Sequence, residues 1–133
     1  MIAAIADTHA AIWYVFGDRR LSPVARQFMD ESLARGWKIG ISSITLVEIV
    51  YLEEKWRIPP GTLGRFLDLL NAQDGAFQEL PVQSDILQCF RQITREAGPD
   101  LPDRVVGATA LCLGVPVVTR DRRIQAAGLK TVW

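Results

Sequence analysis

The chain opens on an unbroken apolar run, residues 2–6, that ends in the carboxylate of Asp7. A run without polar alternation is typical of a strand covered on both faces, as in a parallel sheet. The next segment, residues 8–16, is apolar nearly all round, which predicts a buried helix. A buried strand followed by a buried helix is the first half of a βαβ unit, and ligands of such sheets bind beyond the carboxyl ends of the strands. Asp7 is therefore the first candidate for a functional site.

Strand and helix patterns alternate along the rest of the chain, which predicts an α/β fold with a mainly parallel, roughly five-stranded sheet. Ser22 and Pro23 form a typical helix start, and Pro81 would end a strand at an edge of the sheet. The expected further strands are residues 38–42, 77–81, 115–119 and 130–132. The expected further helices are residues 22–35, 44–56 opened by Ser43, 62–72, 83–96 with an apolar stripe at Ile86, Leu87, Phe90 and Ile93, 102–113 and 122–127.

The length of 133 residues suits one domain, residues 1–133. Hydrophobic residues make up 49% of the chain, so a disordered chain is not expected. No apolar run reaches the length of a membrane span and the first residues lack the basic start of a secretory signal, so we expect a cytoplasmic protein that does not enter a membrane. Cys89 and Cys112 both lie in apolar helical patterns, where we expect two reduced, buried side chains.

The charge balance neither requires nor excludes a nucleic-acid substrate. The formal net charge is zero, whereas nucleic-acid-binding proteins usually carry a basic excess. Of the 15 basic residues, however, 12 are arginine, which binds phosphate through two parallel hydrogen bonds where lysine acts as a point charge. A phosphodiester substrate therefore remains open at this point.

Four acidic residues from distant parts of the chain are candidates for one site. Asp7 and Asp121 each follow an expected strand, and the carboxyl ends of parallel strands lie at one edge of a sheet. Glu48 lies near the start of the helix after the second strand. Asp103 lies in the first turn of the helix before the fourth strand, and whether that turn reaches the same edge depends on the path of the preceding loop.

Each acid also has a purely structural interpretation. Asp7 and Asp121 are suited to cap the helices that follow them, and Asp103 suits the positive end of a helix dipole. Glu48 fits the last position of a capping box that starts at Thr45, although a helix start at Ser43 would put Glu48 in the second turn, on an apolar face. A carboxylate on such a face is costly to bury without a partner, so Glu48 is the most informative of the four.

Clustered carboxylates repel one another, and a hard divalent cation removes that penalty. The sequence has no set of cysteines and histidines for zinc. His9 is the one histidine, and we expect it to be a packed residue on a buried helix rather than a base. Glycine-rich phosphate-binding loops are also missing from the sequence. A magnesium-type site of carboxylates fits the acids best.

At these residues the chain resembles the PIN-domain ribonucleases, in particular the VapC-type toxins of prokaryotic toxin–antitoxin pairs. The matching segments are residues 6–13, 42–49, 103–110 and 117–124, in the order of that family. The resemblance implies a three-layer α/β/α sandwich and a Mg²⁺- or Mn²⁺-dependent endoribonuclease that hydrolyses RNA phosphodiesters with a metal-activated water. It also implies a homodimer and an antitoxin that blocks the site.

The same resemblance assigns roles to particular residues. Asp7, Asp103 and Asp121 would be metal ligands, directly or through water, and Glu48 would bind or orient a water at the metal. Thr8 and Thr119 would support the carboxylates by hydrogen bonds. The candidates for binding the RNA backbone are Arg104, Arg120, Arg122 and Arg123, each of which could instead belong to a solvated face.

Two other functions stay open. One is a catalytically silent PIN-like module that only binds RNA or a partner, which the neutral net charge slightly favours. The other is a magnesium-dependent receiver-like domain, which lacks the adjacent acid pair and the strand-end lysine expected there. Asp100 is expected to cap the helix that Pro102 opens, and Trp37, Trp56 and Trp133 are candidates for interface anchors or for core packing.

Overall fold

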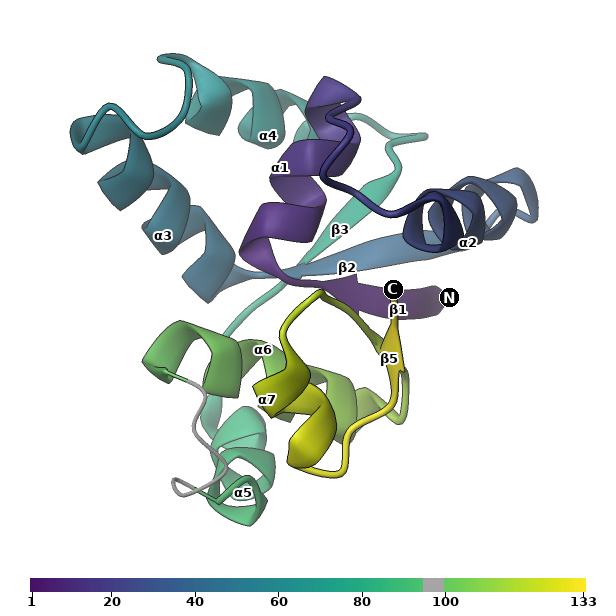
Figure 1. Ribbon diagram of the computed structural model, residues 1–133, viewed down its shortest axis with the longest axis vertical. Coiled ribbons are helices and arrows are strands. Elements are labelled where there is room, and N and C mark those ends of the chain that lie inside the picture. Colours follow the sequence, from purple (N-terminus) through teal and green to yellow (C-terminus); the bar gives the residue numbers. More distant parts are fainter. Residues whose placement is uncertain (95–99) are drawn as a thin grey trace.

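The computed structural model describes residues 1–94 and 100–133. Its centre is one sheet in which every strand pairs in parallel with its neighbours, in the order β3-β2-β1-β4-β5 (Figure 1). The expected parallel sheet of five strands is thereby confirmed, and so is the edge position of the strand before Pro81. The strands are β1 (Ile2–Ala6), β2 (Lys38–Ser42), β3 (Phe77–Leu80), β4 (Val117–Val118) and β5 (Thr131–Val132).

Helices lie on both sides of this sheet, which confirms the three-layer α/β/α arrangement. One face of the sheet is covered by α1, α2, α3 and α4. The other face is covered by α6 and α7, and α5 packs on the outside of α6. Within the described residues, no helix is both long and apolar enough to cross a membrane. The helices are α1 (Thr8–Phe16), α2 (Pro23–Ala34), α3 (Ser43–Glu54), α4 (Thr62–Asn71), α5 (Ser84–Gln92), α6 (Leu101–Leu113) and α7 (Arg122–Ala126).

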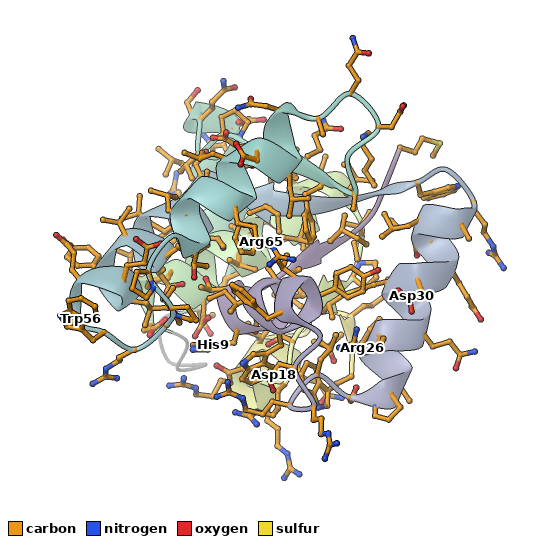
Figure 2. All side chains as sticks on the ribbon, turned by 90° about the horizontal axis from the view of Figure 1, so that it is seen from above. His9, Asp18, Arg26, Asp30, Trp56 and Arg65 are labelled. Atoms are coloured by element: carbon orange, nitrogen blue, oxygen red, sulfur yellow. A yellow bond between two sulfur atoms is a disulfide. The ribbon has the colours of Figure 1, made fainter. Side chains whose placement is uncertain are left out.

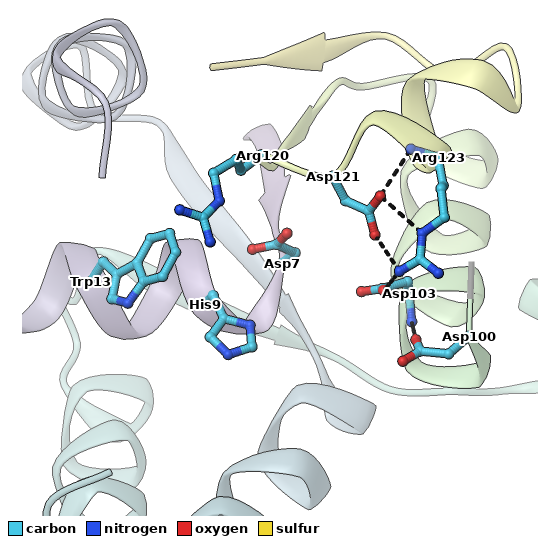
Figure 3. Close-up of a pocket in the computed structure, with 8 residues that line it drawn as sticks. All are labelled: Asp7, His9, Trp13, Asp100, Asp103, Arg120, Asp121 and Arg123. Carbon is cyan, nitrogen blue, oxygen red and sulfur yellow. Dashed lines mark hydrogen bonds and ion pairs between the residues drawn. The ribbon is translucent and has the colours of Figure 1, made fainter. Parts of the chain in front are cut away.

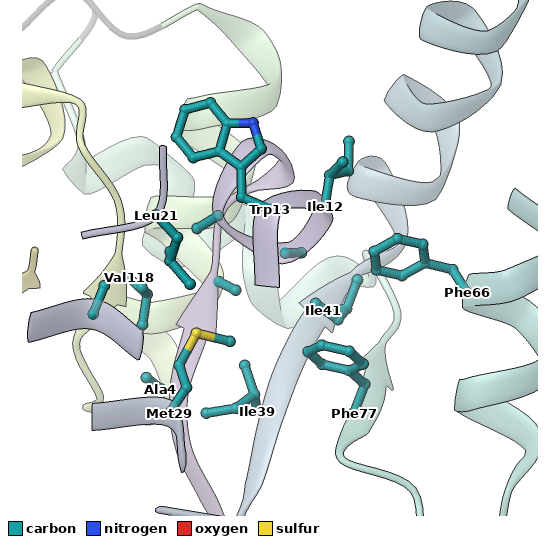
Figure 4. Packing of buried hydrophobic residues seen from close by; sticks show 14 of the residues in the cluster. Ala4, Ile12, Trp13, Leu21, Met29, Ile39, Ile41, Phe66, Phe77 and Val118 are labelled. Atoms are coloured by element: carbon teal, nitrogen blue, oxygen red, sulfur yellow. The ribbon is translucent and has the colours of Figure 1, made fainter. Parts of the chain in front are cut away.

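Strand β1 is apolar without a break because its residues face helices on both sides. Ala4 and Ala6 belong to the larger core cluster under α1 and α2, shown in Figure 4, whereas Ile5 belongs to the cluster under α6 and α7. Side chains of a strand alternate between the two faces, so a strand covered on both faces needs apolar residues at every position. β1 is therefore the buried centre of the sheet, and its carboxyl end delivers Asp7 to the edge.

The helix boundaries follow the expected start and stop signals. Ser22 accepts a hydrogen bond from the Ala25 amide at 3.0 Å, with Pro23 at the first helical position. Helix α3 begins three residues earlier than a capping box at Thr45 would require, since Ser42 is its N-cap and Ser43 its first residue. Gly114 ends α6 in the left-handed conformation at φ 67°.

The expected helix over residues 83–96 is only partly correct. Helix α5 ends at Gln92, and Ile93 is already extended. The predicted end at Glu96 and the stop at residues 98–99 lie outside the described residues. The apolar stripe is also narrower than expected, because Leu87 is 54% exposed while Ile86 and Ile93 are buried. The fourth and fifth strands are shorter than predicted, since only two residues of each pair in the sheet.

The expectation of two separate, reduced cysteines is wrong. Cys89 on α5 and Cys112 on α6 form a disulfide, with their Cα atoms 5.8 Å apart. The two residues are 23 positions apart and approach only because α5 packs along α6, next to Ile86, Ile93 and Ala108. Sequence periodicity placed both cysteines on helices but carried no information on how these helices pack.

Candidate active site at the carboxyl edge of the sheet

Four carboxylates line one open cavity of about 370 Å³ (Figure 3): Asp7, Asp121 and, at the start of α6, Asp100 and Asp103. Asp7 follows β1 and Asp121 follows β4, which are neighbours in the sheet. Asp103 lies in the first turn of α6. The N-terminus of α6 therefore lies at the same edge of the sheet, a point that the sequence left open.

Asp7 is nearly buried, and both of its carboxylate oxygens accept hydrogen bonds. Its Oδ1 accepts from the Ala10 amide at 2.8 Å, which caps α1, and its Oδ2 accepts from the Thr119 hydroxyl. Burial raises the pKa of Asp7, and these two hydrogen bonds oppose that rise. Thr119 in turn accepts from the Asp121 amide at 3.0 Å, so one hydroxyl connects the two strand-end acids.

The pKa values of Asp103 and Asp121 are shifted in opposite directions. Burial, followed by the neighbouring Asp100, raises the pKa of Asp103 to about 8. For Asp121, burial raises the pKa but hydrogen bonds from Arg123 outweigh it, so that the pKa is lowered. The Arg123 guanidinium lies 3.1 Å from Asp121 and 4.0 Å from Asp103. A cation of the chain itself thus lies between Asp121 and Asp103.

Glu48 does not line this cavity but is connected to it through α1. Its Oε1 accepts a hydrogen bond from the hydroxyl of Thr8, the residue after Asp7, and that hydroxyl also lies 3.2 Å from Thr45 Oγ1. Burial raises the pKa of Glu48, and the charges of Asp100 and Asp7 contribute. Because α3 begins at Ser43, Glu48 lies in the second turn, and the capping-box interpretation is wrong.

The prediction that other acids of the site cap helices is correct, but it does not describe their whole role. Asp7 caps α1, Asp121 caps α7 by accepting from the Arg123 amide at 2.8 Å, and Asp100 caps α6 by accepting from the Asp103 amide at 3.2 Å. These caps use one oxygen of each carboxylate. The same residues line the cavity, so capping and a role in the site are compatible.

The four arginines named from the sequence lie in different surroundings. Arg120 lines the cavity, with its guanidinium 4.8 Å from the ring centre of Trp13, and Arg123 lines it as described. Arg122 is exposed and does not line it. Arg104 is turned away, since its guanidinium donates to the carbonyls of Phe90 and Ile93 at the end of α5.

Sequence reasoning missed two aromatic residues that line the cavity. His9 was expected to be packed but is exposed, and its ring lies 5.6 Å from that of Trp13. Figure 3 shows both rings on α1 beside Asp7 and Arg120. The available signal was spacing: His9 and Trp13 lie one helical turn apart, in a helix that starts at the strand end.

The carboxylates of the cavity are suitable ligands for a hard divalent cation, but they are not already arranged around a metal position. Carboxylate oxygens are the ligands that Mg²⁺ prefers, and Mg²⁺ keeps several waters, so few protein ligands are needed. In residues 1–94 and 100–133, no group of three or more histidine, cysteine, aspartate or glutamate side chains is close enough to hold a metal as it stands. Asp7, Asp103 and Asp121 would hold the ion with water completing its shell, and Arg123 would have to move.

Comparisons with known proteins match this architecture. Residues 4–129 match the model of the PIN domain. A search of curated proteins found no match to the chain.

Several solved structures share the fold. VapBC2 from Rickettsia felis, bound to a DNA fragment, is similar at a TM-score of 0.69 and 16% identity over 98% of this chain and 97% of that one. FitAcB from Neisseria gonorrhoeae is similar at a TM-score of 0.59 and 21% identity, over 98% of this chain and 96% of that one. A toxin–antitoxin complex from Klebsiella pneumoniae is similar at a TM-score of 0.57 and 23% identity, over 89% of this chain and 86% of that one. Because the PIN domain match spans nearly the whole chain, this protein belongs to the PIN domain family.

Proposed function

We propose that the chain is a Mg²⁺- or Mn²⁺-dependent endoribonuclease and the toxin of a toxin–antitoxin pair. The observation that carries this proposal is the meeting of Asp7, Asp103 and Asp121 around one cavity at the carboxyl edge of the sheet. Membership of the PIN domain family and the likeness to structures solved as toxin–antitoxin complexes support it. Acting on cellular RNA, the protein would work in the cytoplasm.

The chain's own residues would prepare the cavity for a phosphodiester. A bound divalent ion would supply charge neutralisation and an activated water. Thr119 holds one oxygen of Asp7, and Asp103, with a pKa of about 8, must release its proton before it binds a cation. Glu48 is fixed through Oε1 by Thr8, which leaves Oε2 to orient a water. Arg120, at the rim, would bind a phosphate oxygen.

The direct test is cleavage of RNA by the purified full chain with and without divalent ions. Wild type should cleave only with Mg²⁺ or Mn²⁺, and Asp7→Asn should abolish cleavage while keeping the helix cap, because asparagine also caps helices. Asp68→Asn, at an exposed aspartate of α4 outside the cavity, is the matched control and should cleave like wild type. Cleavage that persists in excess chelator would refute the metal mechanism.

The partners are proposals of their own. We expect a homodimer in solution, measured by light scattering coupled to size exclusion, and an antitoxin encoded beside the toxin. Co-expression of the small neighbouring reading frame should suppress cleavage and growth arrest. Growth arrest that no neighbouring frame relieves would argue against the toxin–antitoxin role and leave the nuclease proposal standing.

A catalytically silent module that only binds RNA or a partner is the second candidate. The observation that favours it is the Arg123 guanidinium beside Asp121 and Asp103, where a cation would otherwise be expected. Glu48→Gln separates the two candidates, because it keeps an acceptor for Thr8 and removes a charge. Unchanged growth arrest in this variant would favour the silent module, and lost arrest would favour the nuclease.

A further inference from the structure

A second cavity, of about 470 Å³, adjoins the candidate active site and shares His9 and Trp13 with it. Helix α1 supplies one wall, since His9, Ile12, Trp13 and Phe16 follow the spacing i, i+3, i+4, i+7 that places residues on one helical face. The opposite wall comes from the end of α3 and the following loop, with Leu52, Ile58 and Pro59. We call this cavity the α1 groove.

Exposed aromatic rings stand at both ends of the α1 groove. His9 is exposed at the end that opens on the acidic cavity, and Phe16 is 39% exposed at the other. His9 and Phe16 are seven positions apart, so their backbone positions are about 10 Å apart along the helix axis. Trp13, which is nearly buried between them, forms the floor.

Two arginines, Arg20 and Arg57, line the α1 groove, and a third lies against Phe16. Arg57 lines the α1 groove, and no carboxylate of the described residues pairs with it. Arg65 lies 5.1 Å from the ring centre of Phe16. Arg20 is neutralised by Asp18 at 2.7 Å. Figure 2, which looks down on α1, shows His9, Asp18 and Arg65 around this helix. Aromatic rings between cations are the composition that binds single-stranded nucleic acid, because bases stack on the rings and phosphates pair with the cations.

We propose that the α1 groove is a nucleobase subsite, in which His9 and Phe16 stack on bases of single-stranded RNA beside the phosphodiester held in the acidic cavity. The inference rests on the proposed function, since a phosphate at Asp7 must place its flanking nucleoside next to His9. The continuity of the two cavities and the positive rim favour a nucleotide over an apolar peptide segment.

Binding of short single-stranded RNA to the full chain tests this subsite without depending on turnover. In an Asp7→Asn background, Phe16→Ala and His9→Ala should each weaken binding about five- to twentyfold, whereas His9→Phe, which keeps a ring, should bind like the parent. Trp37→Ala is the matched control, because Trp37 is also 39% exposed but lines a cavity at the opposite edge of the sheet. A thermal melt of each variant checks that it is folded.

Oligonucleotides with one abasic position locate the base. One abasic position beside the cleaved bond should weaken binding to the parent, and His9→Ala should add little to that loss. Phe16→Ala removes the contact with another base and should still weaken binding further. If RNA is cleaved as proposed while both alanine variants bind as tightly as the parent, the subsite is refuted and the nuclease stands, and the α1 groove would then suit a protein partner. If wild type neither binds nor cleaves RNA, both proposals fail.

Discussion

Asp7 combines structural and chemical roles in one carboxylate. Its position at the end of a buried strand and before a helix could be read from the sequence, because the apolar run and the helical pattern meet there. Its second hydrogen bond could not be read from the pattern, and only the family resemblance named Thr119 as a support for the carboxylates. Thr119 is 112 positions away and reaches Asp7 through the pairing of β1 with β4. The position of the acid can be predicted from the sequence, whereas its hydrogen-bond partners depend on how the strands pair.

Thr119→Val should lower nuclease activity about ten- to hundredfold, because residues that orient ligating carboxylates typically contribute that much. Valine matches threonine in shape but cannot donate to Asp7. Thr109→Val is the control, as Thr109 is equally buried and its hydroxyl bonds only the Val105 carbonyl within α6. Thr119→Val should lose more stability in urea unfolding than Thr109→Val, because the Thr119 hydroxyl also accepts from the Asp121 amide. Equal activity in the two would show that the bond to Asp7 has no part in the reaction.

Arg104 was named as a candidate RNA-binding residue from its place beside Asp103, and its surroundings favour a structural role. The guanidinium bonds the Ile93 carbonyl at 2.8 Å and lies 3.9 Å from the ring centre of Phe90. Arg104→Gln should therefore lower the free energy of unfolding by about 2 kcal/mol. The exposed Arg122→Gln should change it by less than about 0.5 kcal/mol. Urea titrations measure both, and equal stabilities would contradict the assignment.

At the scale of elements, the strongly patterned segments were predictable and the weakly patterned ones were not. Helix α6 begins and ends as expected because Pro102 and Gly114 fix its limits. Helix α5 is shorter than its pattern, since it ends at Gln92 while Ile93, the last residue of the apolar stripe, is extended and still buried beside Ala108 of α6. Its other attachment to α6, the disulfide, is a property of the packing that no periodicity reveals.

The disulfide between Cys89 and Cys112 should contribute to stability through the 23-residue separation that it spans. Closing a loop of that length in the unfolded chain corresponds to about 3 kcal/mol in the chain-entropy model. Reduction should lower the free energy of unfolding by up to that amount. The double variant Cys89→Ala, Cys112→Ala should be insensitive to reductant, and a wild-type protein whose stability does not change on reduction would contradict the expectation.

At the scale of the whole molecule, the fold gathers acids that repel one another, and this sets how stability depends on pH. Burial raises the pKa values of Asp7, Asp103 and Glu48 above their usual values near 4, that of Asp103 to about 8. Between the usual pKa values near 4 and the raised value of about 8, the native state therefore holds more protons than the unfolded state. Its stability is greatest below the unfolded pKa values and falls as the pH rises towards 8. Asp121, with its lowered pKa, acts in the opposite direction and only at acid pH.

A divalent cation should reverse this loss, since it replaces the protons that the acids give up. Added Mg²⁺ should raise the melting temperature more at pH 8 than at pH 6, because at pH 6 the cation must displace a proton from Asp103. Asp103→Asn should flatten the pH dependence of the metal-free protein and reduce the effect of Mg²⁺ at pH 8. Asp68→Asn, outside the cavity, should do neither. Thermal melts of the three proteins at both pH values give the answer, and a Mg²⁺ effect of equal size at pH 6 and pH 8 would mean that the acids around the cavity are not where the cation binds.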